Sequence, residues 1–122
     1  MLLILEMPAV GARMREGTVH NVLVPAGVRI EKGVPLVEVR VDLSADANQN
    51  CPPISYFRIV ASEAAWFRAL DVSQGETRPV GAALARFTTL ADEPLSGEGR
   101  VLRVSVAIVL PQPRRRPVVA NG

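Results

Sequence analysis

The sequence predicts an all-β fold, and three observations lead to this prediction. The chain of 122 residues is 48% hydrophobic but only 4% aromatic, which indicates a core of Val, Leu, Ile and Ala side chains. Short Val-rich runs are separated by Gly, Pro and Asn at intervals of about ten residues, as in proteins built from short strands. The apolar periodicity of an amphipathic helix is hard to find anywhere in the sequence. A chain of this length is expected to fold as one domain around one core.

Seven segments have the pattern of strands. The first three are the apolar run LLILEM, the β-branched run GTVHNV and the alternating run PLVEVRV. The next two, ISYFRIVA and WFRAL, are rich in β-branched and aromatic residues, and ALARF follows a glycine turn. With a final Val-rich run, the expected strands are residues 2–7, 17–22, 35–41, 54–61, 66–70, 83–87 and 101–110.

The last expected strand has apolar residues at alternate positions, so one of its faces is expected to be buried. These residues are Leu102, Val104, Val106, Ile108 and Leu110. Residues 90–99, which contain one proline and two glycines, are interpreted as a linker before this strand. The strand either covers the rest of the domain or pairs with another chain, and an exposed edge would favour a homodimer through this strand.

Charge and cysteine content argue against several classes of protein. The formal net charge of +2 is too small to indicate a nucleic-acid partner, and the basic run at 114–116 lies in a proline-flanked tail expected to be disordered. The N-terminal run MLLILEMP has no basic leader and reaches Glu6 too early for a signal peptide or a membrane span. We therefore expect a cytoplasmic protein with no membrane partner. The single Cys51 and the single His20 provide neither an internal disulfide nor a zinc site.

The sequence matches itself at an offset of 48 residues. GVRIEKGVPLVEV at 27–39 aligns with GETRPVGAALARF at 75–87, which pairs Gly27 with Gly75 and Gly33 with Gly81. Each half has the order strand, glycine turn, glycine turn, strand, and glycine supplies backbone angles that other residues reach only at a cost. Two copies predict halves that pack face to face with approximate two-fold symmetry, because a solenoid needs more repeats.

These segments resemble the lipoyl and biotinyl carrier domains of 2-oxo acid dehydrogenase acyltransferase subunits and biotin-dependent carboxylases. MPAVG at 7–11 is similar to the MPALG that opens lipoyl domains, and EGTV at 16–19 is similar to their EGTV. PLVEV at 35–39, then GET at 75–77 and VG at 80–81, continue the pattern. The resemblance runs from about residue 2 to residue 87. It implies a flattened β-barrel, or barrel-sandwich hybrid, of two related halves with four strands each, plus an extra C-terminal strand in this chain.

The residue that carries the cofactor in that family is missing here. The family attaches lipoate or biotin to the lysine of an Asp-Lys pair at the hairpin between the halves, and the aligned positions are Asp42 and Leu43. Aligning from the second half puts the lysine position near Pro53, and the difference implies about ten extra residues in the hairpin. Because both cofactors form amides with primary amines, Leu43 cannot accept either. The expectation is a protein without a cofactor.

The resemblance implies a division of the chain and a function. The expected parts are a lipoyl/biotinyl-like domain at 1–90, with halves at 1–43 and 54–90 and an enlarged loop at 44–53, a linker and added strand at 91–110, and a Pro/Arg tail at 111–122. The expected function is non-catalytic protein–protein interaction, with a partner in a 2-oxo acid dehydrogenase or carboxylase system. The chain is not expected to be an enzyme, although it could serve as an accessory or carrier subunit of an enzyme complex.

The alternative is a carrier that is modified at a non-standard residue. Its candidates are Cys51 in the enlarged loop and Lys32, the only lysine in the chain, and lipoate or biotin would be a cofactor only through one of them. The candidate interaction or modification loop contains Asp46, Asn48, Asn50 and Cys51. No base adjoins Cys51 in the sequence, so an inert thiol is the simpler interpretation. No metal site is expected, because Asp42 and Asp46 supply too few oxygens for calcium.

Four other side chains have expected environments. His20 has no nucleophile at a suitable spacing and is expected to face solvent. Trp66 and Phe67 are strand neighbours, so one of the two should be partly exposed. Arg78 occupies the position that Ile30 has in the first half. Because an unpaired buried guanidinium is costly, Arg78 should point outward or pair with a carboxylate such as Glu76.

Overall fold

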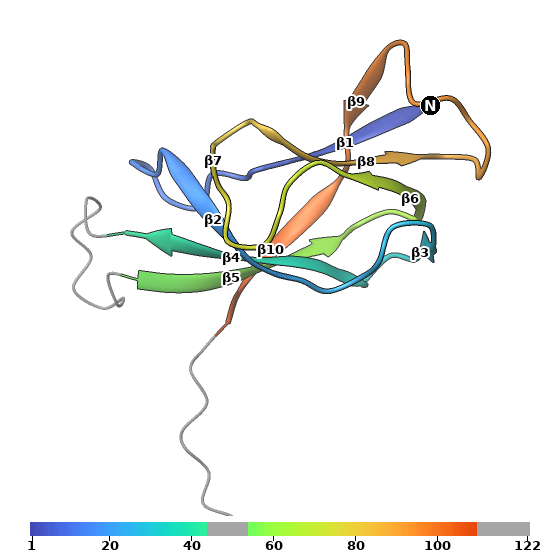
Figure 1. Cartoon of the computed structure of the whole chain (residues 1–122). Coiled ribbons are helices and arrows are strands. Elements are labelled where there is room, and N and C mark those ends of the chain that lie inside the picture. The colour runs from blue at the N-terminus through green and yellow to red at the C-terminus, as the bar shows by residue number, and fades with distance from the viewer. Residues whose placement is uncertain (44–53, 110–122) are drawn as a thin grey trace, which may run out of the picture.

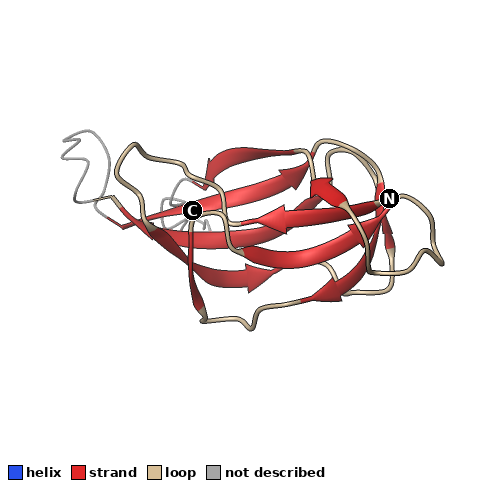
Figure 2. Ribbon diagram, turned by 90° about the horizontal axis from the view of Figure 1, so that it is seen from above, coloured by secondary structure: helices blue, strands red, loops and turns tan. Residues whose placement is uncertain are grey.

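The computed structural model describes residues 1–43 and 54–109, and this part of the chain consists of strands and loops (Figure 2). The predicted all-β fold is therefore confirmed. The loop residues Asp46, Asn48, Asn50 and Cys51, and the predicted disorder of the tail, lie outside the described residues. The strands are β1 (Leu2–Glu6), β2 (Glu16–Val22), β3 (Arg29–Ile30), β4 (Pro35–Asp42), β5 (Ile54–Ala61), β6 (Ala65–Leu70), β7 (Thr77–Pro79), β8 (Ala83–Thr88), β9 (Gly99–Val101) and β10 (Val104–Val109).

The strands form two five-stranded sheets that lie in two layers (Figure 1). One sheet has the order β3-β6-β8-β1-β9, and the other has the order β10-β5-β4-β2-β7. Neither sheet closes into a barrel, so each has two edge strands. Successive strands alternate between the two sheets except at β4–β5 and β8–β9, which brings residues distant in sequence to one core.

The core between the sheets is built mainly from aliphatic side chains, as the composition predicts. Its only stacked aromatic pair among the described residues is Phe67 and Phe87, whose ring centroids are 4.7 Å apart. These two rings occupy directly paired positions of β6 and β8. The buried apolar cluster draws residues from both sheets: Leu3, Leu5, Met7, Val19, Ile30, Leu36, Val37, Val39, Val41, Ile59, Phe67, Leu84, Phe87 and Leu102 are among its members.

The offset of 48 residues recurs in the pairing of the strands. Thr18 pairs with Arg40 between β2 and β4, and the residues 48 positions later, Trp66 and Thr88, pair between β6 and β8. Both ladders then show a register shift at the same step, between Val19 and Asn21 in one ladder and at the equivalent step in the other. A register shift at the same step in both ladders supports their equivalence, because a bulge changes the direction of the strand that contains it.

The pairing between the halves follows the same rule. Gly17 pairs with Arg78 between β2 and β7, and the equivalent pair, Ile30 with Ala65, joins β3 to β6. Residues that align at the offset of 48 positions therefore also occupy equivalent places in the strand ladders.

Glycines at equivalent turns have equivalent geometry. Gly27 and Gly75 have φ angles of 97° and 92°, in the left-handed region that is costly for residues with a Cβ. The N–H of Gly27 donates to the carbonyl of Phe67 at 2.7 Å, and the N–H of Gly75 donates to the carbonyl of Val19 at 2.6 Å. Each turn is thus fastened to the strand of the opposite half.

The C-terminal segment differs from the prediction in two ways. The single strand expected at 101–110 is instead two strands, because the chain turns inward at Leu102, which is 1% exposed and joins the core. β9 pairs in parallel with β1, and β10 pairs antiparallel with β5. The expectation of a buried face is wrong for Val106 and Ile108, which are 37% and 44% exposed because β10 is an edge strand. Leu110 lies outside the described residues.

Candidate functional site

The end of the β4–β5 hairpin is the position to which the resemblance assigns cofactor attachment. The two strands pair from Pro35 and Val60 to Asp42 and Ile54, where the described part of the hairpin ends. Asp42 is exposed, and Leu43 is half-buried and packs against the core. Position 43 thus holds an apolar side chain that packs against the core.

A groove with a volume of about 990 Å³ lies beside this hairpin end. Its lining comes from three parts of the chain: residues 12–18, which lead into β2 and include its first three residues, the paired ends of β4 and β5, and Thr77 of β7. The lining residues are Ala12, Arg13, Met14, Arg15, Glu16, Gly17, Thr18, Arg40, Asp42, Ile54 and Thr77.

Packing of methionines beneath Gly17 fixes one wall of the groove. A Cβ at Gly17 would lie 2.8 Å from the sulfur of Met7 and 3.3 Å from the methyl carbon of Met14, so a larger residue would require these two side chains to shift. The backbone N–H of Val10 also donates to the sulfur of Met14 at 3.2 Å. Because Met14 is held against the core, Arg13 and Arg15 on either side of it lie at the groove.

The groove has a cationic lining. Three arginines and two carboxylates contribute to it, which gives a formal charge of 3 − 2 = +1. Arg40 reaches the groove because its β4 position is paired with Thr18 of β2. The hydroxyls of Thr18 and Thr77 share a hydrogen bond of 2.8 Å at this wall. Guanidinium groups beside hydroxyls are suited to bind carboxylate or phosphate groups.

A smaller hollow of about 370 Å³ adjoins the groove. It is lined by Thr18, Val19, His20, Arg40, Gln74 and Gly75, so Thr18 and Arg40 contribute to both hollows. His20 is exposed, as predicted, and its ring meets that of Tyr56 edge-on at a centroid distance of 4.7 Å. Within the described ranges, no group of three or more His, Cys, Asp or Glu residues could hold a metal ion.

The residues that the sequence singled out are not all at this end of the molecule. Lys32 is exposed in the turn between β3 and β4, at the opposite end of β4 from Asp42 (Figure 1). Phe67 is buried and Trp66 is half-buried, which confirms the predicted difference between them. Arg78 forms the predicted ion pair with Glu76, and its Nε atom is buried without a hydrogen-bond partner.

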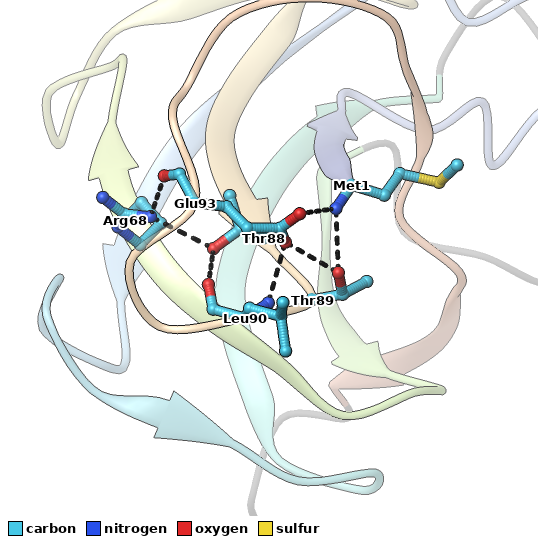
Figure 3. Close-up of polar contacts among 6 residues, drawn as sticks. All are labelled: Met1, Arg68, Thr88, Thr89, Leu90 and Glu93. Atoms are coloured by element: carbon cyan, nitrogen blue, oxygen red, sulfur yellow. Dashed lines mark hydrogen bonds and ion pairs between the residues drawn. The ribbon is translucent and has the colours of Figure 1, made fainter.

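A cluster of polar contacts joins the N-terminus to the segment after β8 (Figure 3). The N-terminal ammonium group contacts the carboxylate of Glu93 and donates to the Thr89 hydroxyl at 2.8 Å. These contacts, with hydrogen bonds from Thr89 and the Leu90 N–H, lower the pKa of Glu93 to about 2. Arg68 donates to the Thr88 hydroxyl at 3.2 Å and to the Glu93 carbonyl at 2.5 Å. These contacts join the N-terminus and β6 to the segment that follows β8.

A second cluster fastens the C-terminal strands to the domain. The Glu63 carboxylate accepts hydrogen bonds of 2.8 and 2.6 Å from the Arg100 guanidinium, and one of 2.8 Å from the Arg103 N–H. The hydrogen bonds from Arg100 are the main reason why the pKa of Glu63 falls to about 2, and burial opposes this change. No sequence pattern predicted this contact, because Glu63 and Arg100 are 37 positions apart.

Comparison with known proteins identifies no relative: no family model, curated protein or solved structure matches the chain. In the described ranges, no helix is long and apolar enough to cross a membrane.

Proposed function

We propose that this protein is a lipoyl-like domain that carries no cofactor and acts by protein–protein interaction. The observation that carries the proposal is the equivalence of the two ladders at an offset of 48 residues, including the shared register shift in β2–β4 and β6–β8. It supports a barrel-sandwich hybrid of two pseudo-two-fold-related halves, the architecture that the resemblance implies. The two glycine turns at equivalent positions support it as well.

The absence of a carrier function follows from the chemistry of the attachment position. Leu43 offers no amine, and its side chain packs against the core. The only lysine in the sequence, Lys32, lies at the other end of β4. A swinging cofactor has to project from the hairpin end to reach separate active sites, so an attachment at Lys32 would not serve that purpose.

The groove beside the hairpin end is the proposed docking surface. In a carrier domain this end would present the cofactor to partner enzymes, and here it presents Arg15, Arg40 and the Thr18 and Thr77 hydroxyls. A partner with an acidic segment matches this lining, because carboxylates accept hydrogen bonds from guanidinium groups. The proposed partner is a component of a 2-oxo acid dehydrogenase or biotin-dependent carboxylase system, a link that rests on the sequence resemblance alone.

Binding of purified dehydrogenase and carboxylase subunits to the immobilised chain tests the docking surface. Arg40→Glu reverses a charge shared by both hollows, and Arg29→Glu makes the same change at exposed Arg29 on β3. We expect one of these subunits to bind, with affinity at least ~10-fold lower for R40E and unchanged for R29E. Equal binding by R40E and wild type, or failure of every subunit to bind, would contradict the proposed docking role.

A further inference from the structure

The strand β10 has one edge that no described strand covers. The Arg103 carbonyl accepts a hydrogen bond of 2.9 Å from the Ser62 N–H, which fixes the direction of the backbone groups that follow. Because these directions alternate in an antiparallel ladder, Ser105, Ala107 and Val109 bond toward β5. Val104, Val106 and Ile108 therefore direct their N–H and C=O groups outward from the sheet.

This edge lacks the protection that the other edge strands have. In the described ranges the other three edge strands have two or three residues and contain arginine: Arg29 in β3, Arg78 with Pro79 in β7, and Arg100 in β9. β10 has six residues, VSVAIV, without a charge, a proline or a glycine. Natural edge strands are commonly kept short, charged or interrupted by proline, because an uncovered edge is a template for another strand.

The apolar face of β10 is also incompletely covered. Val106 and Ile108 pair with Ile59 and Phe57 of β5, so they lie on the core side of the sheet, yet they are 37% and 44% exposed. A strand added beside β10 would extend this face and cover these two side chains. The unpaired backbone groups and the exposed apolar side chains of β10 thus indicate the same kind of partner, a β-strand.

We propose that the partner is a second copy of this chain, joined antiparallel through β10 with the two-fold axis at Val106. In this register Val106 faces Val106 of the second copy, and Val104 faces Ile108, so all outward-directed backbone groups are paired and every cross-strand pair on the apolar face is β-branched. On the other face Ser105 meets Ala107. The strand is self-complementary, as a symmetric interface requires.

Charge placement favours the same register. Arg103 lies opposite Val109 of the second copy, so the two Arg103 side chains are six strand positions apart, roughly 20 Å, beyond a Debye length at physiological ionic strength. An axis at Val104 would bring the two Arg103 residues within two positions of each other and would pair fewer residues. Since a six-residue strand pair is small beside a standard interface, the dimer should be weak, with Kd on the order of 10 μM.

Sedimentation velocity from 1 to 300 μM, a range on the order of the expected Kd, tests the association. Wild type should shift from monomer to dimer, V106K should remain monomeric, and V101K, which changes an exposed residue of β9, should behave as wild type. Thermal melting of V106K checks that it is folded. A wild type that stays monomeric over this range would overturn the proposal. If the wild type is monomeric and a variant without residues 111–122 dimerises, the edge of β10 is covered by the chain's own C-terminal segment, and the proposal is overturned as well.

Cross-linking in a C51S background tests the register. Facing residues of a hydrogen-bonded antiparallel pair have Cα atoms about 5.5 Å apart, which is within the range of a disulfide. V106C should therefore form a covalent dimer under mild oxidation, and V101C should not. A dimer that V106C fails to cross-link would overturn the proposed axis. The β10 dimer does not depend on the function proposed above, because neither the groove nor Leu43 contributes to it.

Discussion

Replacement of Leu102 by alanine tests whether the C-terminal strands share the core of the domain. Leu102 is 1% exposed, belongs to the apolar cluster and donates its N–H to the Ile4 carbonyl at 2.8 Å. Buried Leu→Ala changes cost about 2–5 kcal/mol, and a site closed on all sides belongs near the middle of that range, at about 3 kcal/mol. Total stabilities of small domains are about 5–15 kcal/mol, so the variant should still fold.

Urea unfolding followed by tryptophan fluorescence is the assay for this change. Trp66 lies in β6, which does not pair with β9 or β10, so its signal reports whether a change at Leu102 affects the whole domain. In thermal melts of a domain of this size, a loss of about 3 kcal/mol should lower the melting temperature of L102A by about 12 °C. Val101→Ala, at a neighbouring residue that is 49% exposed, should change stability by less than about 0.5 kcal/mol.

Two results would refute this reasoning. A loss below about 1 kcal/mol for L102A would mean that its contacts contribute little, contrary to the cost of a buried cavity. A separate unfolding transition of the C-terminal strands, without a change in the Trp66 signal, would mean that these strands are attached to a core that is complete without them.

Three further predictions concern the ion pair of the C-terminal strands, the repeated turns and the groove. The Glu63 pKa is lowered from 4.5 to about 2, chiefly by Arg100, so its contribution to stability is present above about pH 4.5 and is lost as pH falls toward 2. In thermal melts E63Q should lack this part of the acid-dependent loss. Gly33→Ala and Gly81→Ala, at φ angles of 95° and 89°, should each cost about 1 kcal/mol in urea unfolding, and clearly unequal costs would argue against equivalent turns. In binding assays with an acidic partner subunit, R40E should lose affinity at least ~10-fold while R29E does not.

Strand pattern and glycine spacing predicted much of the fold, and the failures have physical causes. The seven expected strands were found near their predicted positions, although the last is divided in two. β3 and β7 were missed because two or three residues with arginine or proline have no recognisable pattern. The start of β9 at Gly99 was assigned to the linker at 90–99, because glycine is typical of linkers. In the fold, a Cβ at Gly99 would lie 2.6 Å from the Leu2 carbonyl oxygen, so this glycine permits close pairing with β1.

Alternation correctly predicted which residues of β10 share a face but not whether that face is covered. The burial of Val106 and Ile108 depends on which other elements cover the face of an edge strand, and the arrangement of those elements is a property of the whole fold. The groove escaped prediction for a similar reason. Arg15 and Arg40 are far apart in sequence, and only the β2–β4 register brings their segments together. That positions 42 and 43 hold aspartate and leucine, with no lysine, can in contrast be read from the sequence alone.

Intact mass measurement tests whether this domain carries an acylated amine. The chain is co-expressed with lipoyl and biotinyl ligases in medium that contains lipoate and biotin, and an authentic lipoyl domain and an authentic biotinyl domain are expressed in parallel to show that both ligases are active. We predict that the chain has the mass of the unmodified polypeptide, with Leu43 in place of the acceptor. A lipoyl or biotinyl adduct, which tandem mass spectrometry would assign to Lys32, Cys51 or another residue, would contradict the account.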